Sequence, residues 1–175
     1  VRREAGAWLG GENRRLVVGG VRSAGREAAV VRAKEAVYRE DGARNDDATH
    51  CYVSNDYVLQ LADECPQILA GCSINPVRRD ALRELERCYA AGARLIKVHT
   101  AIQGVDPALP RFDAFYKSAA EFGVVLMFHT GYEHSCTVVS QQFTDPKRLA
   151  RPLDFGGNLI AAHRGTCAFF DREDY

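Results

Sequence analysis

The chain has 175 residues, of which 46% are hydrophobic and 26% charged, and its 23 basic residues balance 23 acidic ones. This composition is typical of one globular domain rather than of a disordered chain. Because the formal net charge is zero, we expect no nucleic-acid partner and no attraction to an anionic membrane. No apolar run approaches the roughly 20 residues that span a bilayer, and the N-terminus does not resemble a signal peptide, so we expect a cytoplasmic protein.

The N-terminal part of the chain carries the weakest signals. Residues 1–37 are assigned to a separate segment with little periodicity, in which the pairs Gly10-Gly11 and Gly19-Gly20 are expected to interrupt any helix or strand. A weak strand is predicted within residues 28–37. Residues 38–175 form the predicted main domain.

From about residue 50, strand and helix patterns alternate. Short apolar runs predict buried strands at residues 68–75, 94–100, 124–131 and 158–163. Apolar residues at helical spacing predict helices at residues 54–65, 80–91 and 111–122, and Asp145-Pro146 is expected to start a short one. This alternation favours parallel strands joined by right-handed crossovers.

The cysteines are predicted to be free thiols in a reducing compartment, since none forms a CxxC pair and no secretory signal is present. The chain contains Cys51, Cys65, Cys72, Cys88, Cys136 and Cys167.

Titratable residues recur where the predicted strands end. Lys97, His129 and His163 lie 32 and 34 residues apart, close to the roughly 31 residues of one unit in a (β/α)₈ barrel. We therefore predict an α/β fold, a partial (β/α)₈ TIM barrel with about five βα units. Side-chain alternation places Lys97 and His99 on the face that points into the barrel.

The same alternation of side chains assigns His129 and His163 each to one face of its strand. His129 is expected to share a face with Met127, and His163 to share one with Leu159 and Ala161. Three neighbouring strands would then direct titratable groups toward one axis, which indicates a functional site.

Four motifs in a fixed order carry a family resemblance. SINP at 73–76, GARLIKVH at 92–99, FHTG at 128–131 and AHRGT at 162–166 make residues 38–175 similar to the amidohydrolase superfamily, specifically its metal-dependent hydrolases with a TIM-barrel fold. The resemblance implies a metal-ligating histidine at His129. It implies that His163 binds a second metal or acts on the substrate, and that Lys97 is a catalytic residue, either carboxylated or unmodified.

The resemblance also implies a function. We expect a divalent metal, zinc or manganese, to activate water for attack on an amide or ester-like bond of a small-molecule substrate. A histidine that does not bind the metal could carry the proton. The alternative on the same fold is the nonoxidative decarboxylation of aromatic acids. His99, Glu133 and His134 are predicted to contact the substrate.

The chain departs from the superfamily pattern in two respects. It contains no HxH pair of the kind found on the first strand of such barrels, and its motifs end with the sixth-strand histidine. We therefore expect a fragment of a longer enzyme. A noncatalytic α/β fragment without a complete metal site stays open, and so does a homo-oligomer that covers the exposed strand edges.

Overall fold

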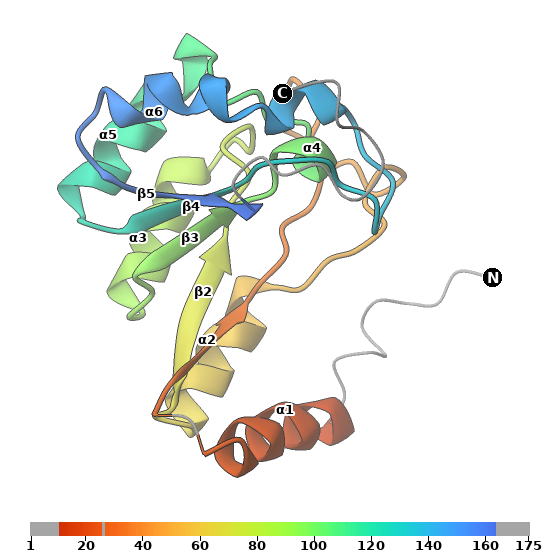
Figure 1. The fold of residues 1–175 in the computed structure, drawn as a ribbon, viewed down its shortest axis with the longest axis vertical. Coiled ribbons are helices and arrows are strands. Elements are labelled where there is room, and N and C mark those ends of the chain that lie inside the picture. Colours follow the sequence, from red (N-terminus) through yellow and green to blue (C-terminus); the bar gives the residue numbers. More distant parts are fainter. Residues whose placement is uncertain (1–10, 26, 164–175) are drawn as a thin grey trace.

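The computed structural model describes residues 11–25 and 27–163, which form a parallel sheet with helices against it (Figure 1). Each strand pairs in parallel with the next one along the chain. The strands are β1 (Ala29–Arg32), β2 (Ile68–Ser73), β3 (Leu95–Val98), β4 (Val125–His129) and β5 (Asn158–Ala162). The predicted α/β architecture is thus confirmed. Residues 164–175 of the predicted main domain, with Cys167, lie outside the described part.

The helices fall mostly where their start and stop signals predict them. They are α1 (Gly11–Ser23), α2 (Asn55–Glu64), α3 (Ala81–Ala90), α4 (Thr100–Gln103), α5 (Asp113–Glu121) and α6 (Ala150–Leu153). Three short 3₁₀ turns, η2 (Pro110–Phe112), η3 (Gln141–Thr144) and η4 (Pro146–Leu149), accompany them. The Ser54 side chain accepts the Tyr57 N–H at 3.2 Å, which is the expected cap of α2. Within the described residues, no helix is both long and apolar enough to cross a membrane.

The N-terminal segment contains more structure than the sequence pattern indicates. Helix α1 continues through Gly19 and Gly20, so the predicted interruption there is wrong. Its apolar residues Val17, Val18 and Val21 pack against a buried cluster on α2 and β2. This tertiary contact compensates for the roughly 1 kcal/mol by which each glycine disfavours a helix. Strand β1 also lies in this segment and pairs with β2.

The main core lies between the sheet and the helices α3 and α5. Strand residues such as Ile96 and Phe128 pack there against Leu85 and Tyr116, all fully or almost fully buried. The rings of Tyr116 and Phe128 meet edge to face with their centroids 6.3 Å apart. Buried thiols fill the remaining space as small apolar groups; they are Cys65, Cys72 and Cys88, all free.

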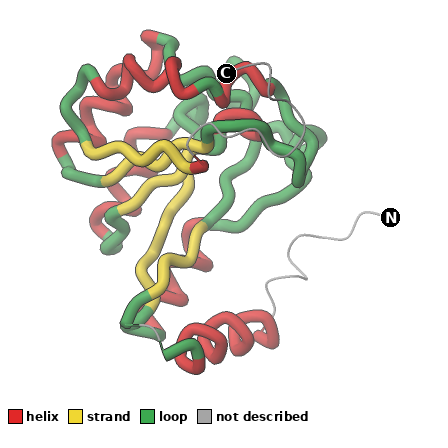
Figure 2. The backbone as a smooth tube through the Cα atoms, viewed as in Figure 1, coloured by secondary structure: helices red, strands yellow, loops and turns green. Residues whose placement is uncertain are grey.

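The opposite face of the sheet has no covering helix among the described residues. Val30, Leu69 and Ile160 on this face remain 48%, 53% and 40% exposed. The loops gather instead beyond the carboxyl ends of the strands, on the side where α4 lies (Figure 2). A functional site in a parallel sheet is expected at this edge.

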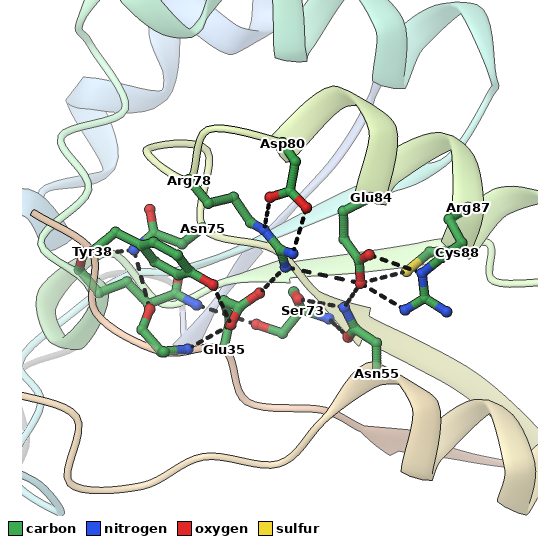
Figure 3. Close-up of polar contacts among 12 residues, drawn as sticks. Glu35, Tyr38, Asn55, Ser73, Asn75, Arg78, Asp80, Glu84, Arg87 and Cys88 are labelled. Atoms are coloured by element: carbon green, nitrogen blue, oxygen red, sulfur yellow. Dashed lines mark hydrogen bonds and ion pairs between the residues drawn. The ribbon is translucent and has the colours of Figure 1, made fainter. Parts of the chain in front are cut away.

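A buried polar network beside the end of β2 holds the surrounding segments together (Figure 3). The Arg78 guanidinium donates to Glu35 at 2.6 Å and to Asp80 at 2.7 Å, and it lies 3.9 Å from Glu84. Glu35 and Glu84 are both buried. The network therefore ties the loop after β1 to the start of α3.

The network continues to the end of β3. Asn55 Nδ2 donates to Glu84 at 2.7 Å and to the Ser73 carbonyl at 3.0 Å. Ser73 Oγ donates to the Lys97 carbonyl at 2.9 Å and accepts from Gln103 Nε2 at 3.2 Å. Because these groups are buried, their hydrogen bonds fix the relative positions of the two strand ends.

Candidate metal centre

A cleft of about 650 Å³ opens at the carboxyl ends of the strands. Its wall contains six of the sequence-predicted site positions together with residues that the sequence analysis did not single out. The lining residues are Arg32, Ala33, Lys34, Val53, Ser73, Lys97, His99, His129, Tyr132, Glu133, His134, Ser135 and His163. The strand-end positions predicted from the roughly 31-residue spacing thus line a single cavity.

Three of these side chains form a compact group of metal-donor atoms. One donor atom each from His99, His129 and Glu133 lies within 4.8 Å of the other two. Glu133 Oε2 is 2.8 Å from His99 Nε2 and 3.8 Å from His129 Nε2. The two imidazole rings are stacked, with centroids 4.1 Å apart. His129 and Glu133 are buried and His99 is half-buried.

This donor set fits a divalent metal. A tetrahedral ion with bonds of about 2.0–2.2 Å holds its ligand atoms about 3.3 Å apart, between the two distances found here. Two imidazoles and one carboxylate form a known catalytic zinc set. His129 Nε2 is buried and has no hydrogen-bond partner, and such an orphaned buried nitrogen is expected where a ligand is missing. The cluster therefore has the atoms, the spacing and the unmet bonding capacity of a metal centre.

The electrostatics of the cluster also favour the metal-binding protonation states. Burial, aided by the neighbouring His129, lowers the pKa of His99 to about 3. Burial and the nearby Lys97 lower the pKa of His129 to about 4. For Glu133, burial raises the pKa, but hydrogen bonds from Ser135 outweigh it, and the pKa falls to about 2. At neutral pH both imidazoles are neutral and the carboxylate is ionised, as metal ligands must be.

Backbone contacts set the positions of the two histidines. His129 ends β4, and its imidazole hydrogen-bonds to the Gly131 backbone, an interaction that fixes the ring of a ligating histidine. Thr100 Oγ1 donates to the His129 carbonyl at 2.9 Å. The His99 N–H donates to Gln103 Oε1 at 2.6 Å across the short helix α4. The sequence pattern did not indicate this turn of helix, which orients His99.

Glu133 is held by its own loop. Gln141 clamps its backbone, since the Glu133 N–H donates to Gln141 Oε1 at 3.0 Å and Gln141 Nε2 donates to the Glu133 carbonyl at 2.6 Å. The Ser135 N–H donates to Glu133 Oε1 at 2.6 Å. One carboxylate oxygen is thereby occupied, and the other faces the histidines.

His163 reaches the cleft by a different route from the one predicted. Leu159 and Ala161 pack on the helix-side core, so the predicted inward face for these residues of β5 is wrong. The strand ends at Ala162, and His163 adopts a φ of 70°, a left-handed conformation that is uncommon outside glycine. This turn brings its ring to 4.8 Å from that of His129, centroid to centroid.

The other predicted residues lie around the cluster. Lys97 is buried and its Nζ has no hydrogen-bond partner, while burial, together with nearby Arg32, lowers its pKa to about 7. His134 is exposed and stacks on Tyr132. His99 and Glu133, predicted to contact substrate, lie in the donor group with His129, and His163 lies beside that group.

Arg32 and Lys34 were not predicted as site residues. Both belong to the segment that was assigned little structure, and both line the cleft. The sequence feature that could have identified them is their separation of two residues within the predicted weak strand, because alternate side chains of a strand lie on one face.

The pKa values predict how the stability of the metal-free protein depends on pH. Because His99 and His129 have pKa values of about 3 and 4 in the folded state, the unfolded chain takes up their protons first as pH falls below about 6.5. We expect the unfolding free energy to fall by up to about 1.4 kcal/mol per pH unit for each histidine between pH 6.5 and about 4. Urea denaturation across this range measures the slope. An H99N/H129N double variant should show a flatter dependence, and an equal slope would contradict the assignment.

Comparisons with known proteins support the architecture. The model of the amidohydrolase family matches residues 3–167. An uncharacterised TIM-barrel protein from Bordetella bronchiseptica superposes with a TM-score of 0.63 at 17% identity, covering 84% of this chain and 50% of that one. A 2,6-dihydroxybenzoate decarboxylase complexed with 2,6-dihydroxybenzoate gives a TM-score of 0.48 at 19% identity, covering 63% and 43%. A comparison with curated proteins found no significant match.

These findings settle the fold and the family. The chain spans about half the length of the solved structures that it matches. The five parallel strands of the described residues, with helices against one face, correspond to a partial TIM barrel, as predicted. The family match extends over most of the sequence. This protein belongs to the amidohydrolase family.

Proposed function

We propose that this chain carries the metal site of a metal-dependent hydrolase that acts on a small molecule. The supporting observation is the convergence of donor atoms from His99, His129 and Glu133 within 4.8 Å. The donor set suits zinc, with manganese as the alternative. When bound there, the ion would supply Lewis-acid activation of water near neutral pH.

The roles of the protein side chains follow from their positions. His163 lines the cleft, and its ring lies 4.8 Å from the His129 ring between centroids. Its imidazole can accept the proton that water loses as it attacks a carbonyl carbon and can return this proton to the leaving nitrogen or oxygen. The His99 and His129 rings would not compete for that proton, since the metal would occupy their donor nitrogens.

A second candidate is the nonoxidative decarboxylation of an aromatic acid. The family includes both hydrolases and decarboxylases. The observation that favours this reaction is the buried Lys97 Nζ, which faces the cleft without a partner and could pair with a carboxylate.

The test combines metal analysis with two substrates. The purified protein is incubated with zinc or manganese, dialysed and analysed for metal; we expect about one equivalent per chain, and less than about a tenth would overturn the proposal. The loaded protein is then assayed with 4-nitrophenyl acetate and with salicylate. Metal-dependent ester cleavage supports hydrolysis, and carbon dioxide release from salicylate without ester cleavage supports the second candidate. Untreated and chelator-treated samples serve as controls.

A further inference from the structure

We propose that Arg32, Lys34 and Lys97 form an oxyanion subsite in the cleft, which binds a carboxylate or phosphoryl group of the substrate. This inference deepens the proposed function by naming the substrate class, and it rests on that function. The substrate would be a small organic anion that places its charged group on these three cations and its reacting bond beside the His99–His129–Glu133 cluster.

The sheet brings the three cations to one wall. Arg32 ends β1 and pairs in register with Gly71, which in turn pairs with Leu95 on β3. Paired residues of parallel strands share a face, so Arg32 lies on the same face as Lys97, two residues beyond Leu95. Gly71 leaves room between them, since a side chain there would approach Arg32 Cγ to 2.9 Å. Lys34 follows Arg32 by two residues and also lines the cleft.

None of the three cations has an acidic partner among the described residues. The Arg32 guanidinium contacts Met127 Sδ at 3.9 Å, and Lys34 Nζ contacts Cys136 Sγ at 3.4 Å. Lys97 is only 4% exposed, yet its Nζ has no hydrogen-bond partner at all. A buried ammonium without partners is unfavourable unless a ligand supplies an acceptor.

The carboxylate in the cleft forms its ion pairs with the histidines and none with these three basic side chains. Glu133 is the one carboxylate among the lining residues, and its oxygens are directed to His99 and to Ser135. By comparison, Arg78, Arg148 and Arg151 elsewhere in the described chain each pair with a carboxylate at 2.6–2.7 Å. In the cleft, by contrast, three basic side chains of the described chain line one cavity without a paired carboxylate.

The chemistry of the three groups defines the ligand. A guanidinium presents parallel N–H donors that match the two oxygens of a carboxylate or phosphoryl group, and ammonium groups add charge without a fixed direction. The cleft volume of about 650 Å³ suits a small molecule. A bound oxyanion would also reduce the repulsion between three like charges on one wall.

The test measures anion binding in the absence of metal. The protein is kept in chelator and titrated calorimetrically with benzoate, with its neutral isostere benzamide, and with inorganic phosphate. We expect benzoate or phosphate to bind, and benzamide to bind at least about tenfold more weakly than benzoate. The substitutions R32Q and K34Q should each weaken anion binding by about tenfold or more. The control is K117Q, because Lys117 is an exposed lysine on α5 outside the cleft, and it should bind as the wild type does.

Each outcome bears on the proposal. Tighter binding of benzoate assigns the subsite to a carboxylate, and tighter binding of phosphate assigns it to a phosphoryl group. Equal binding of benzoate and benzamide, or anion binding unchanged in both R32Q and K34Q, overturns the subsite. The metal content of R32Q and K34Q is measured separately and should equal that of the wild type, so failure of the metal site and failure of the anion subsite give different results.

Discussion

His129→Ala is expected to leave the protein unable to retain a divalent metal. The substitution removes one of the three donors of the cluster, whose Nε2 lies 3.8 Å from Glu133 Oε2 and whose ring stacks on that of His99 with the centroids 4.1 Å apart. Losing only an outer-shell partner of a metal site weakens binding by about 10–100-fold, and removing a ligand should exceed that. After incubation with zinc and dialysis, elemental analysis should find less than about a tenth of an equivalent.

The cleft offers a matched control for this variant. His134 lines the same cleft, but it is exposed and stacks on Tyr132 rather than joining the donor cluster. His134→Ala should therefore keep the metal content of the wild type. Glu133→Gln preserves side-chain volume and removes the charge, so it should reduce the metal content as His129→Ala does. Full metal content in His129→Ala, or loss of metal in His134→Ala, would show that the cluster is not the metal site.

The fold was predictable because its signals are local. Apolar runs such as 125–129, and helix ends marked by Ser54 and by Gly92 with its φ of 95°, are readable within a few residues of sequence. Helix α1 was not predictable in this way. Its stability comes from packing Val17, Val18 and Val21 on residues at least about forty positions away, and intrinsic propensity does not report such contacts.

The site was predictable to the extent that strand alternation controls it. Lys97 and His129 lie on regular strands, so the period of two places them on the cleft side. The positions of the Glu133 and His163 side chains depend on local features that the two-residue alternation of a strand does not describe. The Gln141 clamp turns Glu133 toward the histidines, and the positive φ of His163 redirects its ring. Neither a loop clamp nor a left-handed residue has a signature in composition or periodicity.

Arg78→Met should cause a large loss of stability, although the residue lies outside the cleft. The Arg78 side chain is 16% exposed and its partner Glu35 only 3%, at a distance of 2.6 Å. Removing the guanidinium leaves Glu35 buried without its counter-charge, and leaves Glu84 with one partner fewer. Breaking a buried pair from one side typically lowers the unfolding free energy by about 3–5 kcal/mol. Urea denaturation at pH 7 measures this change.

The adjacent Arg79 provides the control for the Arg78 prediction. Arg79 forms an ion pair with Asp41 at 3.2 Å, but the two side chains are 69% and 62% exposed. An exposed pair contributes about 0–1 kcal/mol because water solvates both charges once the pair is broken. Arg79→Met should therefore change stability little. Equal effects of the two substitutions would mean that burial around Glu35 does not govern the strength of this network. Since the same network fixes the end of β2 to the Lys97 carbonyl through Ser73, Arg78→Met should also weaken metal binding in whatever fraction remains folded.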